Sequence, residues 1–132
     1  MRAFGAKLVA EGMWSDIMNN IVPPAIPKLF DAAYKEGARI HSNSWGAPNS
    51  NGRYDSWASQ ADKWTFEHPD FLPVFAAGND SADRNQDGVI DEGSVSSPGS
   101  TKNVLTVGAS KNFLTKGGIQ RKMTDLQDGK NK

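Results

Sequence analysis

Oxygen-bearing side chains at alternate positions form the first pattern in this sequence that could do chemistry. Asp83, Asn85 and Asp87 are separated by single residues, and Gly88 follows directly. Carboxylate and amide oxygens at this spacing, next to a glycine that permits a sharp turn, can wrap a hard cation such as Ca²⁺. We therefore predict a structural calcium site. Its predicted ligands are the side chains of Asp83, Asn85, Asp87 and Asp91 and the backbone carbonyl of Val89.

The calcium pattern matches an EF-hand loop in part. The loop positions one, three, five, six and nine agree, but position twelve, normally a bidentate glutamate, is Ser94. The sequence shows no flanking pair of EF-hand helices. A solvated acidic turn is the alternative interpretation of the same residues.

An amide side chain just before this loop could stabilise negative charge. Asn79 follows the small residues Ala76, Ala77 and Gly78, which end an apolar run that begins at Leu72. An amide at a strand end, with small neighbours that let a ligand come close, is what an oxyanion donor requires. Asparagine after glycine is also a frequent turn residue, so both interpretations stay open on these residues alone.

The other polar residues do not complete an active site. His41 lies within a strand pattern and His68 lies at a helix end before Pro69, so we assign both to structure. No serine lies in a Gly-x-Ser-x-Gly turn, and none is preceded by Gly-Thr. Composition and spacing therefore do not predict an enzyme without further information.

The elements that must position these residues follow from the apolar pattern. We predict strands at residues 7–13, 39–43, 72–77 and 104–108, with loops at residues 14–23 and 47–53. One helix follows Pro23-Pro24 and ends at Gly37, and a second is capped by Asp55 and ends before Pro69. Strands and helices that alternate in this way indicate an α/β fold, a parallel β-sheet with helices on both faces.

Length and composition indicate one domain without a nucleic-acid partner. The 132 residues contain 15 basic and 15 acidic side chains, so nothing points to nucleic acid or to an anionic membrane surface. Cysteine is absent, which excludes disulfides and thiolate metal sites. No apolar run approaches the roughly 20 residues of a membrane span. The polar end at residues 111–132 is expected to be poorly ordered.

Three stretches together resemble the subtilisin-like serine peptidases, or subtilases. They are ARIHSNSWG at residues 38–46, FAAGN at residues 75–79 and SPGSTKNVLTVGA at residues 97–109. Their order and separation match the central part of that family's catalytic domain, so the resemblance covers roughly residues 6 to 110. It implies that residues 1–132 are part of a subtilisin-like catalytic domain with a three-layer fold.

The resemblance implies a role for each matching position. Asn79 matches the oxyanion-hole asparagine of the family. Further residues match the two walls and the floor of the family's S1 pocket. This pocket holds the substrate side chain that precedes the cleaved bond. The matching residues are Ser44, Trp45 and Gly46 for one wall, Ala76, Ala77 and Gly78 for the other, and the Ser97-Pro98 floor region, where the family often has a cis peptide bond.

The catalytic triad of the family does not match any residue here. Its aspartate and its His-Gly-Thr segment would precede Met1, and its Gly-Thr-Ser-Met segment would follow Lys132. The resemblance therefore implies an internal part of a secreted or periplasmic, calcium-stabilised serine endopeptidase that acts on polypeptides. We expect the isolated chain to hydrolyse nothing. A non-catalytic α/β module that binds calcium or a partner is the alternative.

One strand of the family's sheet would also be missing. The strand that carries the catalytic aspartate lies between the counterparts of residues 7–13 and 39–43. Without it, strand edges and apolar helix faces are bare, and we expect self-association through them.

Overall fold

Three parallel strands form the centre of the chain. The computed structural model describes residues 5–79 and 83–109, so the predicted polar end at residues 111–132 lies outside the described residues. The strands β3 (Ile40–Asn43), β4 (Leu72–Ala76) and β5 (Leu105–Val107) lie side by side in that order. The register pairs Ile40 with Leu72 and Val74 with Leu105. The predicted parallel α/β arrangement is confirmed, with each of these strands slightly shorter than expected.

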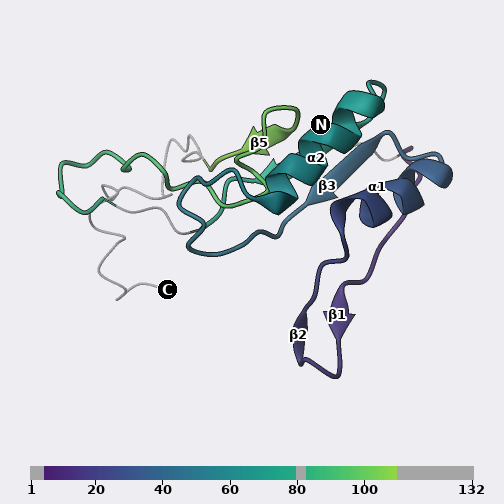
Figure 1. Cartoon of the computed structure of the whole chain (residues 1–132), viewed down its shortest axis with the longest axis horizontal. Coiled ribbons are helices and arrows are strands. Elements are labelled where there is room, and N and C mark those ends of the chain that lie inside the picture. The colour runs from purple at the N-terminus through teal and green to yellow at the C-terminus, as the bar shows by residue number, and fades with distance from the viewer. Residues whose placement is uncertain (1–4, 80–82, 110–132) are drawn as a thin grey trace.

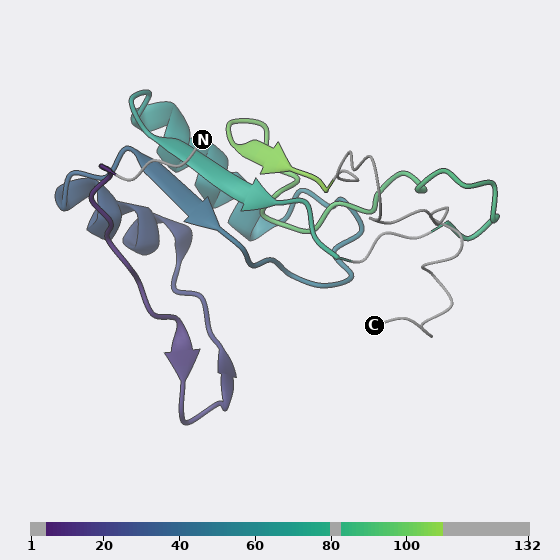
Figure 2. The same ribbon diagram turned by 180° about the vertical axis from the view of Figure 1, so that it is seen from behind.

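Both helices lie on the same face of this sheet. Helices α1 (Ile26–Lys35) and α2 (Ser56–Glu67) are in front of the strands in Figure 1, and the strands are in front of the helices in the reverse view of Figure 2. The strands lie in the sheet in the same order as in the chain. Right-handed connections between successive parallel strands in such an order all pass over the same face of the sheet. We expected helices on both faces, but the described residues place none on the second face.

An aromatic cluster fills the space between the helices and the sheet. Phe30 is fully buried, and its ring centroid lies 5.3 Å from that of Trp64 and 5.4 Å from that of Phe71. Phe75 of β4 is also fully buried and closes the cluster from the sheet side. The alternating burial along β4 follows from strand geometry, because successive side chains point to opposite faces.

The helix ends agree with the sequence signals except at the start of α1. The Asp55 carboxylate caps α2 by accepting hydrogen bonds from the amides of Trp57 and Ala58, both at 3.0 Å. Gly37, at φ 92°, follows the end of α1 and permits the last turn to close. The proline in the first turn of α1 is Pro27, so the Pro23-Pro24 pair lies before the helix and not in it.

The N-terminal segment differs from the prediction. Residues 6–13 form no strand, whereas a short hairpin of β1 (Trp14–Ser15) and β2 (Asn20–Ile21) occupies the predicted loop. The hairpin points away from the helices and the sheet in both views (Figures 1 and 2). A strand requires a hydrogen-bonded neighbour. Between residues 6–13 and β3 there is instead a groove of about 840 Å³.

The face of the sheet opposite the helices exposes apolar side chains. Ile40, Leu72, Leu105 and Val107 come from all three strands, and between 42% and 67% of each side chain's surface is exposed. Soluble proteins rarely leave a contiguous apolar face uncovered. In the described part of the chain, neither helix is long and apolar enough to cross a membrane.

Candidate functional site

The three sequence motifs meet at the carboxyl ends of the parallel strands. The segment Ser44-Trp45-Gly46 follows β3, and Ala77-Gly78-Asn79 follows β4. The third motif begins at Ser97 and contains β5; residues 96–103, which we call the pocket loop, lie before this strand. Loops at this edge of a parallel sheet are held by rigid strands, so ligands commonly bind there.

Backbone hydrogen bonds join the pocket loop to both walls. The Ala47 amide, next to Gly46, donates to the Ser97 carbonyl at 2.7 Å. The Ser96 amide donates to the Ala77 carbonyl at 2.8 Å. The segments that the resemblance assigns to the two walls and the floor are therefore brought together, although they are more than 50 residues apart at the extremes.

Gly78 and the pocket loop are in close contact. A Cβ atom placed on Gly78 would lie 2.2 Å from Oγ and 3.0 Å from Cβ of Ser96. Gly78 also has φ of 110°, a backbone conformation that residues with a side chain rarely adopt. Ser96 itself is 6% exposed. Only glycine fits this corner without a displacement of the loop.

Trp45 supports its wall from the side of the core. Its ring centroid lies 5.6 Å from those of Trp57 and Phe75, in edge-to-face geometry. Its indole N–H donates to Oδ1 of Asn43 at 3.1 Å, and Asn43 in turn donates to the carbonyls of His41 and Val74. Ser44 and Gly46, on either side of Trp45, are exposed.

The predicted oxyanion donor lies at the open end of this arrangement. Asn79 is exposed, and so is Gly78 before it. The predicted floor is buried, because Ser97 and Pro98 have less than 2% of their surface exposed and are joined by a cis peptide bond. The structure therefore leaves the predicted donor at the surface and buries the predicted floor.

Side chains of α2 and its preceding loop also hold the pocket loop, and sequence analysis did not identify them. Asp55 accepts a hydrogen bond from the Ser97 hydroxyl at 2.6 Å, and Asp62 accepts one from the Asn103 amide at 2.8 Å. Asp62 is 8% exposed, so it is a buried acidic residue in the middle of a helix. An acidic residue between the apolar positions of α2 was the one feature of the sequence that could have indicated this buried contact.

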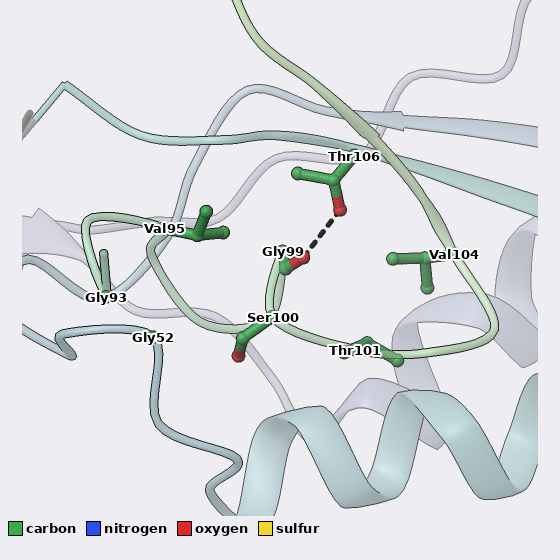
Figure 3. Close-up of a pocket in the computed structure, with 8 residues that line it drawn as sticks. All are labelled: Gly52, Gly93, Val95, Gly99, Ser100, Thr101, Val104 and Thr106. Carbon is green, nitrogen blue, oxygen red and sulfur yellow. Dashed lines mark hydrogen bonds between the residues drawn. The ribbon is translucent and has the colours of Figure 1, made fainter. Parts of the chain in front are cut away.

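A second hollow lies beside the pocket loop. Figure 3 shows its lining, with the Thr106 hydroxyl donating to the Gly99 carbonyl at 2.5 Å. Its volume is about 520 Å³, and Val95 and Val104 supply much of its apolar surface. The predicted wall residues do not line it. Gly99, Ser100 and Thr101 of the pocket loop line it instead.

The predicted calcium loop is folded around its own carboxylates. Asp83, 5% exposed, accepts hydrogen bonds from the Asp87 amide at 3.0 Å and the Gly88 amide at 2.9 Å. Asp91 accepts from the amide of Arg84 at 3.0 Å and lies 3.4 Å from its guanidinium group. Within residues 5–79 and 83–109, no three acidic or histidine side chains gather around one point. The oxygen donors are present, but in this conformation they bind the loop itself.

The two histidines lie in the aromatic core region. Nε2 of His41 is 2.8 Å from Oε2 of Glu11, and its ring contacts Phe30 at 5.2 Å. The ring of His68 stacks on Trp64 at 3.7 Å, and its Nδ1 is 2.8 Å from the Trp64 carbonyl. Both imidazoles are thus engaged in packing, as the sequence analysis assigned them.

Comparison with known proteins relates the chain to one family of peptidases. The sequence profile of the subtilase family matches residues 2–131. The serine protease/ABC transporter B family protein tagD of Dictyostelium discoideum is 34% identical over 112 residues, which are 81% of this chain and 6% of that protein. The tagB protein of the same family and organism is 28% identical over 110 residues, 81% of this chain and 5% of that protein. The chain thus spans only a small part of both relatives.

Proposed function

Because this chain belongs to the subtilase family, we propose that it supplies the oxyanion donor and the S1 pocket of a serine endopeptidase whose Asp-His-Ser triad lies outside these residues. The observation that supports this proposal best is the meeting of three distant segments at one edge of the sheet. The Ala47–Ser97 and Ser96–Ala77 backbone hydrogen bonds hold them there. Substrate backbone would lie between the walls, and its side chain would enter toward Pro98.

In this proposal Asn79 stabilises the negative charge that develops on the carbonyl oxygen during peptide-bond cleavage. Its amide donates a hydrogen bond that strengthens as the oxygen becomes an oxyanion, so it lowers the barrier more than it strengthens substrate binding. The exposure of Asn79 leaves it accessible to a substrate. The proton transfers and the nucleophilic attack belong to the triad.

The proposal is tested with Asn79→Ala and Asn79→Asp in the full-length protein. Both changes remove the amide donor, and Asn79→Asp keeps its size. We expect kcat to fall by about 10²–10³ with little change in KM, the magnitude known for this change in a subtilisin, a member of the same family. Gln60→Ala, which removes an amide from α2, is the control and should leave kcat unchanged. An unchanged kcat in both Asn79 variants would contradict the assignment.

We also propose that the chain alone does not hydrolyse peptides. Both described histidines pack in the aromatic core, His41 against Phe30 and His68 against Trp64, which supports the absence of a general base at the pocket. The purified chain should give no burst of product from an activated ester. A burst that depends on Asn79 would refute this.

A further strand is proposed to fill the groove beside β3. In the family the strand with the catalytic aspartate lies at this place, and the groove of about 840 Å³ runs along the free edge of β3. In the isolated chain the same edge and the exposed apolar face around Ile40 and Leu105 favour pairing with a second copy. Light scattering should therefore detect oligomers of the isolated chain. A monomer at high concentration would argue against pairing.

Calcium binding by the loop at residues 83–91 is proposed as a stabilising element. The alternating oxygen donors support it, although the ligands would have to exchange loop amides for the ion. At 100 times its dissociation constant, Ca²⁺ should stabilise the fold by about 2.7 kcal/mol and raise Tm accordingly. Asp83→Ala should abolish that rise, whereas Asp16→Ala in the hairpin should preserve it. No change in Tm at millimolar Ca²⁺ would count against the site.

A further inference from the structure

We propose that two carboxylates at helix α2, Asp55 and Asp62, are positioning residues that set the side-chain selectivity of the pocket by holding the pocket loop. The inference rests on the proposed function, because the pocket loop carries the predicted floor at Pro98. The two residues are seven positions apart, which places them on the same side of the helix axis. Neither lies in the three motifs that indicate the family.

Asp62 holds the far end of the pocket loop. Its Oδ1 accepts hydrogen bonds from the amides of Lys102 at 3.1 Å and Asn103 at 2.8 Å, and its backbone carbonyl accepts from the Asn103 side chain at 3.2 Å. Its Oδ2 accepts from the Tyr54 hydroxyl at 2.7 Å. A buried carboxylate is unfavourable unless its oxygens are hydrogen-bonded. The two amides are therefore confined to one position relative to α2.

The Asp62 carboxylate changes the pKa of Tyr54, whose hydroxyl it binds. The hydrogen bond to Asp62, then burial and the negative charge of Asp62, raise the pKa of the Tyr54 hydroxyl. The Lys102 ammonium group lies 5.1 Å from the centre of the Tyr54 ring, a cation–π contact that joins this loop residue to the same tyrosine. Tyr54, Asp62 and Lys102 thus form one contact between the helix and the end of the pocket loop.

Asp55 holds the near end. Its Oδ1 accepts the Ser97 hydroxyl at 2.6 Å in addition to the two helix amides that it caps. Ser97 has no exposed surface, and its amide donates to Oγ of Ser50 at 2.7 Å. The residue directly before Pro98 is therefore fixed from the helix side through its side chain.

The pocket loop is thus supported from two directions. Strand-side support comes from the bonds to Ala77 and Ala47, which belong to the walls. Helix-side support comes from Asp55 and Asp62. Loss of the helix-side support should let the floor at Pro98 move relative to the walls, whereas Asn79 keeps its place in the segment that follows β4. Selectivity for the substrate side chain should then change while the charge stabilisation at the reacting carbonyl remains.

The test measures kcat and KM of the full-length protein on two peptide substrates, one with Phe and one with Ala before the cleaved bond. Asp62→Ala removes the far support, and Ser97→Ala removes the near support but leaves the Asp55 cap intact. Asp62→Asn retains an oxygen that can accept the two amides. Asp31→Ala is the matched control, because the Asp31 carboxylate accepts the Trp64 indole N–H at 2.8 Å between α1 and α2, away from the pocket loop.

We expect Asp62→Ala to change the Phe-to-Ala ratio of kcat/KM by about tenfold, mainly through KM, because pocket contacts of one or two methylene groups discriminate on that scale. Ser97→Ala should change the ratio in the same direction by a smaller factor. Asp62→Asn should restore most of the wild-type Phe-to-Ala ratio. Asp31→Ala should lower Tm but leave that ratio unchanged. A ratio unchanged in Asp62→Ala, or changed equally in Asp31→Ala, would overturn the proposal.

Hydrogen exchange keeps the two proposals distinguishable. Peptides that contain Lys102 and Asn103 should exchange faster in Asp62→Ala than in wild type or in Asp62→Asn. Peptides that cover residues 96–98 should exchange faster in Ser97→Ala than in wild type, and peptides from α1 should exchange at the same rate in all variants. This holds whether or not the protein cleaves the substrates. An inactive wild type with the expected exchange pattern would refute the peptidase function alone, and unchanged exchange would refute the positioning role. The selectivity and exchange readouts of Ser97→Ala remain if Asp62→Ala does not fold.

Discussion

Replacement of Gly78 by alanine tests the packing of the proposed pocket most directly. Two separate terms oppose the new side chain. The φ of 110° places a residue with a Cβ in an unfavourable conformation, which costs about 1–2 kcal/mol. The new Cβ would also lie 2.2 Å from Oγ of Ser96, and overpacking of this kind costs about 1–3 kcal/mol. We therefore expect Gly78→Ala to lower the free energy of unfolding by about 2–5 kcal/mol.

The chain offers a matched control that separates the two terms. Gly37 has φ of 92°, but a Cβ added there meets no atom within 4 Å. Gly37→Ala should thus show the conformational term alone, about 1–2 kcal/mol. The double variant Gly78→Ala/Ser96→Gly should recover the steric term, because the opposing Oγ and Cβ are both removed.

Urea unfolding followed by circular dichroism gives the five free energies that this comparison needs, those of wild type, Gly78→Ala, Ser96→Gly, the double variant and Gly37→Ala. The coupling between Gly78→Ala and Ser96→Gly is read from a double-mutant cycle, which isolates the contact between the two residues. Equal losses in Gly78→Ala and Gly37→Ala, or a coupling of zero, would show that Ser96 does not pack against Gly78. The proposed closeness of wall and pocket loop would then be wrong.

Two further predictions concern the body of the fold. Phe30→Ala should lower the free energy of unfolding by about 3–5 kcal/mol in the same urea assay, since it leaves a cavity among fully buried aromatic rings; a loss below 1 kcal/mol would contradict the packing. The second concerns pH. Desolvation favours a higher pKa for Asp70, but hydrogen bonds from the Tyr34 hydroxyl and a backbone amide, together with Arg39 at 2.9 Å, leave its pKa below the ordinary value. Ionised Asp70 therefore stabilises the folded state. This stabilisation is complete above the unfolded-state pKa of about 4 and is lost as pH falls through the lower folded-state pKa. Stability measured from pH 6 to pH 2 should fall less steeply for Asp70→Asn than for wild type, and identical slopes would exclude the effect.

The elements that form from local signals were predicted from the sequence. An apolar face with period 3.6, a Gly37 stop and the Asp55 cap each act within a few residues, so α1 and α2 lie where the pattern placed them. The apolar runs that became β4 and β5 are likewise recognisable, because the strands of parallel sheets are typically apolar on both faces, although here the second face is exposed. The family resemblance rests on the same kind of short contiguous motif.

The features that depend on distant partners were not predictable in this way. Residues 7–13 carry a strand-like pattern but pair with no strand in the described part of the chain, and a hairpin formed in the segment expected to be a loop. The sequence placed Ser97 in the predicted floor but did not indicate its hydrogen bond to Asp55, and it gave Asp62 no role, because both contacts join residues about 40 positions apart. Short motifs indicated which residues could form a pocket, but tertiary packing decided how close Gly78, Ser96 and Pro98 lie and which side chains hold them. Contacts between remote segments are set by the whole fold, and no local spacing encodes them.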